Sequence, residues 1–296
     1  MTTAPDPLEY DWLLDRALRE DRADQDVTTT SVVPPRCRGT ARIVAKESGI
    51  LCGLPVMERL VGKATAGSEL SHEAVDGDAV EPGDVVATVS GGVYAILCVE
   101  RTILNFMQRL SGVATLTSRF VRAVEGTDTH MLDTRKTTPG WRALEKYAVR
   151  CGGGHNHRMN LSDEVLIKEN HLHCLDASGP EAVKIAVQKA WAGTDEGMVI
   201  EVEVETLEEL DAALEAEAHI LLLDNMSVEQ VAEAVRRVRE HRDGDEYPLS
   251  EASGDITLEN AAEYARTGVD RISIGALTHS APALDLSLQL EVERGG

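Results

Sequence analysis

A basic stretch within an acidic chain gives the first indication of chemistry. Residues 133–158 read DTRKTTPGWRALEKYAVRCGGGHNHR and hold six basic residues against two acids, whereas the 296-residue chain has a formal net charge of −22. Guanidinium and ammonium groups are the side chains that hold carboxylates and phosphates. The Gly-rich loop CGGGHNHR and the TTPG turn can add backbone amides to the same anion. We therefore expect this stretch to bind a small polyanion.

Polar residues at the ends of a series of apolar runs extend this candidate site. From residue 129 onward, short apolar runs alternate with helical patterns, which is typical of a parallel sheet. About six such runs leave a doubly wound sheet and a barrel open, and they favour an incomplete barrel over a complete one. The residues at these ends are Asp133, Arg135, Lys136, Lys168, Glu203, Glu205, Asp224, Asn225, Ser253, Gly254 and Gly275. Because the active sites of barrels form at the carboxyl ends of the strands, we expect these groups at one rim.

Two carboxylates in this set point to a metal ion or a sugar. Hard oxygen donors hold Mg²⁺ between a protein and phosphate oxygens, and carboxylates also accept hydrogen bonds from sugar hydroxyls. In the run EVEVE, Glu201, Glu203 and Glu205 share one face of a strand, and Glu203 lies at the centre of that row. We therefore select Glu203 and Asp224 as the acidic part of the site.

Paired histidines open a second interpretation. The motifs GHNHR and HLHC place His155, His157, His171 and His173 close to Cys174, and such a set could bind zinc. No cysteine partner recurs at the spacing of a zinc finger, and nothing around HNH in this acidic chain resembles a nuclease. We expect His157 to form a hydrogen bond with the substrate instead.

Composition bounds the class of protein. An apolar content of 43% suffices for one large core or two. A pI near 4.8 disfavours nucleic acid as a partner, and the excess acids fall on helix faces such as ETLEELDAALEAEAH, as on proteins from salt-rich cytoplasm. The sequence shows no signal peptide, no apolar run near the ~18 residues of a membrane helix and no CxxC pair among its five cysteines. We expect a cytoplasmic protein with reduced thiols and no membrane partner.

Local patterns predict particular elements. Residues 8–21 have the spacing of an amphipathic helix, and residues 39–93 alternate as strands do. Residues 98–126 read as a long helix that is broken or bent near residues 111 and 112. Two later helices begin with capping boxes, formed by Thr206 with Glu209 and by Ser227 with Gln230.

Longer motifs resemble a known family. The chain resembles the quinolinate phosphoribosyltransferases in ERTILNFMQRLSGVAT (100–115), DTRKTTPGWRALEKYAV (133–149), GGGHNHRMNLSDEVLIKENH (152–171), EVEVE (201–205), LLDNM (222–226), EASG (251–254) and GVDRISIGALTHS (268–280). The resemblance extends to EDRADQDVTTT (20–30) near the start. It implies an N-terminal α/β sandwich domain over residues 1–114 and an incomplete α/β barrel of about six to seven strands over residues 115–276. The tail, residues 277–296, is expected to pack back on the first domain.

The resemblance also implies an activity. Enzymes of this family convert quinolinate and phosphoribosyl pyrophosphate to nicotinate mononucleotide, pyrophosphate and carbon dioxide with Mg²⁺, in the de novo synthesis of NAD. The basic stretch would hold the two carboxylates of quinolinate and the phosphates of the co-substrate. The implied assembly is a homodimer, open to further assembly, in which Arg101 enters the pocket of the neighbouring subunit.

Site roles follow from the same motifs. The implied quinolinate pocket consists of Thr134, Arg135, Lys136, His157 and Arg158, together with Arg101. The implied catalytic residues are Lys136, Lys168, Glu203 and Asp224, the last two holding ribose hydroxyls or the metal. The implied phosphate cradle consists of Ser253, Gly254, Asp255, Ile274, Gly275 and Ala276. The family commonly has SGG or SGN where this chain has Ser-Gly-Asp, so Asp255 should turn away from the phosphate or cap a helix that begins near Thr257.

Two other functions fit parts of the pattern. A phosphoribosyltransferase that uses nicotinate would need fewer cations, because nicotinate has a single carboxylate. A barrel that binds a sugar phosphate without catalysis would not need Lys136, Lys168, Glu203 and Asp224 on one rim. Comparing quinolinate with nicotinate as substrates would separate these alternatives.

Overall fold

The computed structural model describes residues 2–64, 67–242 and 248–293. It divides into two compact units, each formed by several stretches of chain. The first unit comprises residues 1–118, 136–154 and 276–296, and the second comprises residues 119–135 and 155–275. The first stretch of the first unit ends at residue 118, and the chain returns to this unit over residues 136–154 and again from residue 276.

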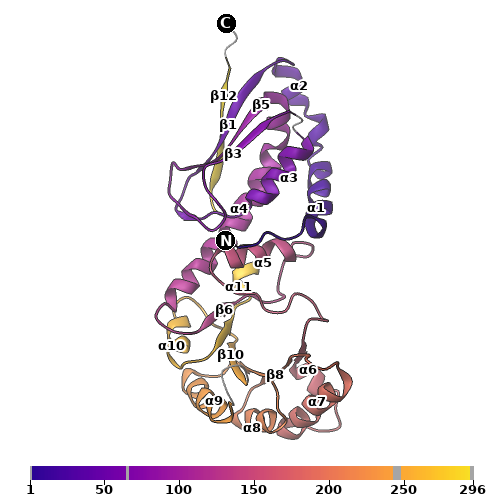
Figure 1. Cartoon of the computed structure of the whole chain (residues 1–296), viewed down its shortest axis with the longest axis vertical. Helices are drawn as coiled ribbons and strands as arrows, with labels where there is room; N and C mark the ends of the chain where they lie inside the picture. Colours follow the sequence, from indigo (N-terminus) through magenta and orange to yellow (C-terminus); the bar gives the residue numbers. More distant parts are fainter. Residues whose placement is uncertain (1, 65–66, 243–247, 294–296) are drawn as a thin grey trace. The chain divides into compact units, whose positions relative to one another are not determined.

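An antiparallel sheet lies at the centre of the first unit (Figure 1). Its strand order is β12 (Leu286–Val292), β1 (Arg38–Ala45), β5 (Val85–Gly92) and β3 (Glu69–His72). A separate antiparallel pair consists of β2 (Gly49–Ile50) and β4 (Ala79–Val80). The C-terminal tail thus contributes a strand to the sheet of the first unit, where Ala45 pairs with Leu286 and Gly39 with Val292.

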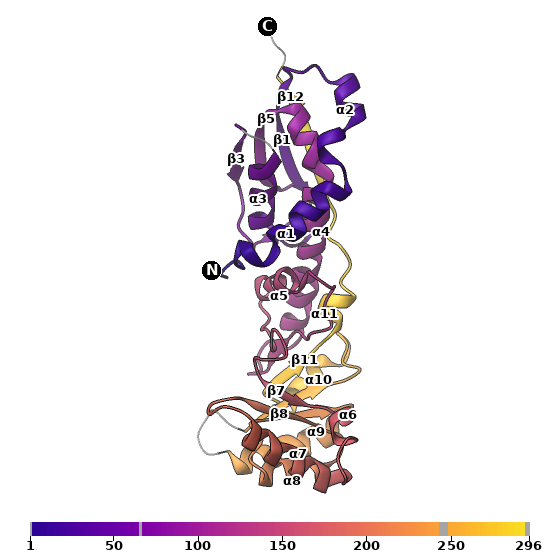
Figure 2. The same ribbon diagram turned by 90° about the vertical axis from the view of Figure 1, so that its right-hand side faces the viewer.

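Three helices lie beside this sheet in both views (Figure 1 and Figure 2), namely α1 (Pro7–Glu20), α3 (Leu54–Ala64) and α4 (Val93–Ala123). Helix α1 confirms the amphipathic pattern, whereas α3 lies in a region that was expected to be strands. Helix α4 continues through residues 111 and 112, so the expected break is not formed. Gly112 instead allows a close approach, because a Cβ there would lie 2.9 Å from the carbonyl carbon of Pro282. The shorter helices of this unit are η1 (Ala23–Gln25), α2 (Val27–Val32), α5 (Arg142–Cys151) and α11 (Ala276–His279).

A parallel six-stranded sheet forms the second unit and confirms the expected strand count. The order is β6 (His130–Leu132), β11 (Arg271–Ser273), β10 (Leu249–Ser253), β9 (Ile220–Asp224), β8 (Ile200–Val204) and β7 (Val165–Ile167). In the described part of the chain β6 and β7 do not pair with each other, so the sheet is an incomplete barrel. The helices are α6 (Glu169–Leu172), α7 (Gly179–Gly193), α8 (Leu207–Glu215), α9 (Val228–His241) and α10 (Ala261–Arg266), and α7, α8 and α9 line the outside of the strands (Figure 1).

The sequence explains why these elements form. Residues 220–223 are buried on both faces of the sheet, as expected of a central parallel strand covered by helices. Ser227 and Gln230 form the expected capping box at the start of α9. Thr206 caps α8 by accepting from the backbone N–H of Glu209. The carboxylate of Glu209 accepts from the backbone N–H of Glu205 and not from that of Thr206, so the expected capping box is only half formed. These caps end the loops just after β8 and β9, and they help to hold the strand ends in place.

Candidate functional site

The expected polar residues lie at the carboxyl ends of the parallel strands. Asp224 ends β9 and pairs in register with Ser253, which ends β10. Glu203 lies one residue before the end of β8, and Lys168 directly follows β7. The carboxyl ends of neighbouring parallel strands meet at one edge, so the sequence correctly placed these groups on a common rim.

Arg135 and Arg158 contribute two guanidinium groups to the second unit. Burial lowers the pKa of Arg158, and the positive charge of nearby Arg135 lowers it further. The Nε of Arg135 is buried and has no hydrogen-bond partner among the described residues. The guanidinium of Arg158 donates from Nη1 to the carbonyl oxygen of Glu164 at 3.1 Å. Two close, partly desolvated cations with an unused buried donor are suited to an anion with more than one acceptor group.

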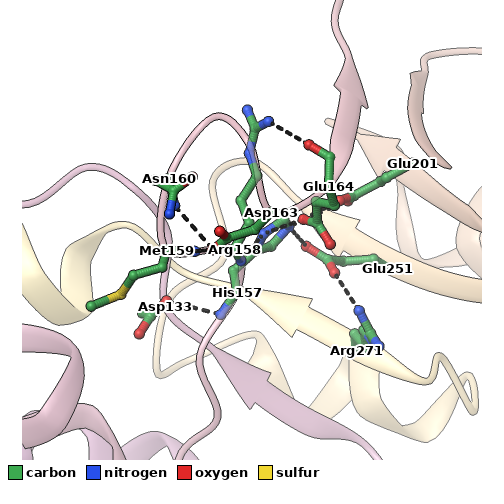
Figure 3. A network of polar contacts seen from close by, with 10 residues as sticks. All are labelled: Asp133, His157, Arg158, Met159, Asn160, Asp163, Glu164, Glu201, Glu251 and Arg271. Carbon is green, nitrogen blue, oxygen red and sulfur yellow. Dashed lines mark hydrogen bonds and ion pairs between the residues drawn. The ribbon is translucent and has the colours of Figure 1, made fainter. Parts of the chain in front are cut away.

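A buried carboxylate fixes the loop that carries this site. Asp133, which is fully buried, accepts from the backbone N–H of His157 at 3.0 Å (Figure 3). It also accepts from the side-chain amide of Asn156 at 2.5 Å. The loop is also tied to β6 by the N–H of His155, which donates to the carbonyl of Met131 at 2.8 Å. These bonds fix the backbone next to Arg158, from which its side chain extends.

The imidazole of His157 is directed at three carboxylates (Figure 3). Its Nδ1 lies 3.0 Å from Glu164 Oε1, and its Nε2 lies 3.1 Å from Glu201 Oε2 and 3.4 Å from Glu251 Oε1. Burial alone would lower the pKa of this histidine, but the three carboxylates outweigh burial and raise its pKa to about 12. The side chain is 7% exposed. The expected hydrogen bond from His157 to substrate therefore remains a prediction, and the ring contacts these carboxylates and the backbone N–H of Arg158.

Glu164, Glu201 and Glu251 are site residues that the sequence reading missed. Burial raises the pKa of Glu201 to about 7, with a contribution from the charge of Glu251 and an opposing one from His157. Burial also opposes ionisation of Glu164, but His157 and Arg158 lower its pKa overall. The EVEVE alternation could have indicated Glu201, because it shares a strand face with Glu203 and lies one layer deeper.

Lys168 and Glu203 form an ion pair at the rim. The Nζ of Lys168 lies 2.5 Å from Glu203 Oε2, and the side chains are 47% and 12% exposed, respectively. The carboxylate of Asp224, on the next strand, accepts from the side chain of Asn225 at 2.7 Å. Carboxylate oxygens are the donor type that Mg²⁺ prefers, and a magnesium site at Glu203 and Asp224 remains a prediction.

The expected phosphate loop follows β10. Gly254 has φ +90°, which a residue with a side chain rarely adopts. Asp255 is exposed and also has a positive φ of 36°. The backbone N–H of Thr257 donates to the side-chain oxygen of Asn260, and α10 begins at Ala261. The expected helix start near Thr257 is therefore wrong.

The second part of the expected phosphate cradle follows β11. The N–H of Ile274 donates to the carbonyl of Leu132 at 2.9 Å, which gives this amide a partner within the sheet region. Gly275 comes next and ends the second unit, and Ala276 begins α11 in the first unit. The amides of Gly275 and Ala276 remain the predicted donors on this side.

Part of the basic stretch serves the first unit. Arg142 donates to the hydroxyl of Thr137 at 3.1 Å, Arg150 donates to the carbonyl of Thr3 at 3.0 Å, and Lys146 is fully buried. Lys136 is exposed in the loop before α5. Three of the six basic residues in this stretch therefore have hydrogen bonds or packing within the first unit.

Of three further expected site residues, Arg101 and Ala276 belong to the first unit, and Thr134 follows β6 in the second. Arg101 lies on α4 with its side chain 61% exposed, 4.0 Å from Glu100. Thr134 is half-buried and precedes Arg135 in the chain. Ala276 belongs to α11.

The side chains that could share a metal ion are not the set that the sequence suggested for zinc. Cys174 is exposed, and its thiol bonds to the carbonyl of Asn170 at 3.4 Å. Among the described residues, the side chains close enough to share an ion are His157 with Glu201 and Glu251, and Cys52 with Asp76 and Cys151. Of the residues that the sequence suggested for zinc, only His157 belongs to one of these groups.

The fold and the rim define an α/β barrel protein with charged side chains gathered at the carboxyl ends of its strands. Family models named quinolinate phosphoribosyl transferase match the chain over residues 26–111 (N-terminal domain) and 113–289 (C-terminal domain). The chain therefore belongs to the quinolinate phosphoribosyltransferase family.

Individual relatives agree with this assignment. The chain is 42% identical to the carboxylating nicotinate-nucleotide pyrophosphorylase of Mycobacterium leprae (strain TN), over 93% of this chain and 95% of that protein. It is 40% identical to the probable enzyme of the same name from Synechocystis, over 98% and 95%. Among solved structures, NadC from Streptococcus pyogenes is 37% identical with a TM-score of 0.89, covering 99% of this chain and 100% of that chain.

Proposed function

We propose that this protein transfers the phosphoribosyl group of phosphoribosyl pyrophosphate to quinolinate and releases pyrophosphate and carbon dioxide. The product is nicotinate mononucleotide, so the protein serves the de novo synthesis of NAD. The observation that carries the proposal is the pair Arg135 and Arg158, in which the charge of Arg135 acts on Arg158 and the buried Nε of Arg135 has no hydrogen-bond partner in the described chain. A ligand with two adjacent carboxylates matches such a pair.

The residues act by binding and positioning rather than by covalent catalysis. Arg135 and Arg158 hold the quinolinate carboxylates and so orient the ring nitrogen towards the anomeric carbon. Lys168, which pairs with Glu203, binds the anionic groups of both substrates. Glu203 and Asp224 accept hydrogen bonds from the ribose hydroxyls, and their charge stabilises the positive charge that develops on the sugar.

The same two carboxylates would hold Mg²⁺. Bound there, the ion would neutralise charge on the leaving pyrophosphate. After transfer, the ring nitrogen is cationic, and it stabilises the carbanion that loss of carbon dioxide leaves on the neighbouring carbon. The cations that hold the second carboxylate therefore act in both the transfer step and the decarboxylation step.

The functional assembly that we propose is a homodimer. Arg101 is exposed on α4, where it can enter the pocket of a second subunit and add a cation for quinolinate. The five cysteines are free, which supports a reducing compartment such as the cytoplasm. Within the described residues, no helix has the length and apolar character needed to cross a membrane.

The test compares two substrates in one buffer. Purified protein is incubated with Mg²⁺, phosphoribosyl pyrophosphate and either quinolinate or nicotinate, in about molar KCl to screen the acidic surface. We expect nicotinate mononucleotide from quinolinate only. Equal product from both acids would refute the dicarboxylate site, and no product from either would favour a protein that binds sugar phosphates without catalysis.

A further inference from the structure

A buried ion pair anchors the loop that carries Lys136. Glu145 on α5 is fully buried, and its Oε1 accepts from the Nη2 of Arg109 on α4 at 2.8 Å. The same carboxylate accepts from the backbone N–H and from the hydroxyl of Thr138, each at 2.9 Å. Three donors thus converge on one carboxylate, and two of them belong to the loop two residues after Lys136.

A second set of bonds joins the same arginine to the other side of the loop. Arg109 donates from Nη1 to the carbonyl of Ala281 at 2.8 Å and from Nη2 to the carbonyl of Thr278. The hydroxyl of Thr278, which is fully buried on α11, donates to the carbonyl of Lys136 at 2.9 Å. The backbone on each side of residue 137 is therefore held through a single guanidinium group.

The end of the loop is packed as firmly as its start. The rings of Trp141 and Phe106 stack with centroids 4.5 Å apart and planes 16° from parallel. Gly140 has φ +82°, and a Cβ at this position would lie 2.8 Å from the ring of Trp12. A loop with an exposed lysine thus has both hydrogen-bonded and apolar anchors within the first unit.

We propose that Arg109, Glu145 and Thr278 are positioning residues that fix the backbone of Lys136 for substrate binding. This inference rests on the proposed function and on the role that the family motifs imply for Lys136, which is to bind an anionic substrate. A buried ion pair adds little stability over a well-packed apolar pair of the same volume, but its directional bonds can select one loop geometry. Thr278 donates to the backbone carbonyl before residue 137, and Glu145 accepts from the backbone N–H after it. Bonds on both sides are what fixing the direction of a neighbouring side chain requires.

The test removes one hydroxyl that reaches the loop and one that does not. Thr278→Val deletes the donor to the Lys136 carbonyl and keeps the side-chain shape. Thr117→Val is the matched control, because Thr117 is also fully buried but donates to Val113 within its own helix. We expect kcat/KM for quinolinate to fall roughly five- to tenfold in Thr278→Val, as for one lost hydrogen bond, and to change by less than about twofold in the control.

A double-mutant cycle shows whether Thr278 acts through Lys136. Once Lys136 has been changed to alanine, a further Thr278→Val substitution should cost no additional activity. Independent, multiplied losses would mean that Thr278 affects activity by another route, and would overturn the proposal. Equal losses for Thr278→Val and Thr117→Val would overturn it as well.

Hydrogen exchange of the segment 136–141 gives a readout that does not depend on catalysis. We expect faster exchange of these amides in Thr278→Val than in wild type or Thr117→Val. Unchanged exchange would overturn the proposal, and so would faster exchange with full activity. If the wild type makes no product from quinolinate, the proposed function fails, and the exchange data still decide whether the network holds the loop.

Discussion

Replacing His157 by glutamine tests the charge state of the buried cluster in the second unit. The imidazole faces Glu164, Glu201 and Glu251, and these carboxylates raise its pKa to about 12. Without the imidazolium, buried carboxylates lose their nearest cation. Breaking a buried ion pair by removing one partner costs about 3–5 kcal/mol, so we expect a loss of this size near pH 7.

The pH dependence provides the sharper measurement. The pKa of this histidine is about 12 in the folded protein and near 6.5 in the unfolded chain. Its stabilising contribution is therefore complete below about pH 6.5 and is lost as the pH rises towards 12. While only the folded state holds this proton, the contribution falls by about 1.4 kcal/mol per pH unit. The difference in unfolding free energy between wild type and His157→Gln should thus shrink by about 2 kcal/mol from pH 7 to pH 8.5.

Urea unfolding at constant high salt, at several pH values across this range, measures the difference. His241→Gln is a suitable control, because this exposed histidine lies in the same unit at the end of α9. A further Glu201→Gln substitution in the His157→Gln background should recover part of the stability by removing one uncompensated carboxylate. Parallel pH profiles for wild type and His157→Gln would also arise if Glu201, whose pKa His157 lowers, took up a proton in the variant, so the comparison is repeated in the Glu201→Gln background. Profiles that stay parallel there would refute the reasoning. They would mean that the ring is neutral and that Nδ1 accepts from the backbone N–H of Arg158, which lies 2.8 Å away.

Three further predictions concern the rim and the assembly. Arg158→Ala should lower kcat/KM for quinolinate by an amount that corresponds to about 2–3 kcal/mol of activation free energy, as for one charge-assisted contact. Calorimetry should show that phosphoribosyl pyrophosphate binds within about twofold of wild type. Gly254→Ala should lower the unfolding free energy by about 1–3 kcal/mol in denaturant titrations, because φ is +90° and a Cβ would lie 3.0 Å from the backbone nitrogen of Asn225; an unchanged midpoint would contradict this. Mixing inactive Arg101→Ala and Arg158→Ala subunits after dissociation should restore roughly a quarter of wild-type activity, since each mixed dimer has one intact shared pocket; no recovery would argue against donation of Arg101 across an interface.

Local patterns predicted much of the fold. The six parallel strands, the first helix and the box at Ser227 follow from apolar periodicity and capping chemistry, which act over a few residues. Helix α3 was missed because it lies between short strands in a region rich in valine and turn residues. The break expected in α4 failed because Gly112 serves a close backbone approach instead of ending the helix.

The sequence by itself determined the chemistry available at the rim. Arg135, Lys168 and Glu203 follow or end apolar runs, and parallel strands place such ends at one edge whatever their order. The long motifs likewise determined the family without any structure.

Only the tertiary structure decided the partners of these groups. His157 faces Glu201 and Glu251 because β8 and β10 flank β9, and that strand order depends on long-range packing that local periodicity does not encode. Likewise, Glu145 reads as one more acid in a basic stretch, and only the approach of Arg109 shows that it anchors a loop. Buried charges must find partners at close range, and the partners available at each site are set by the fold.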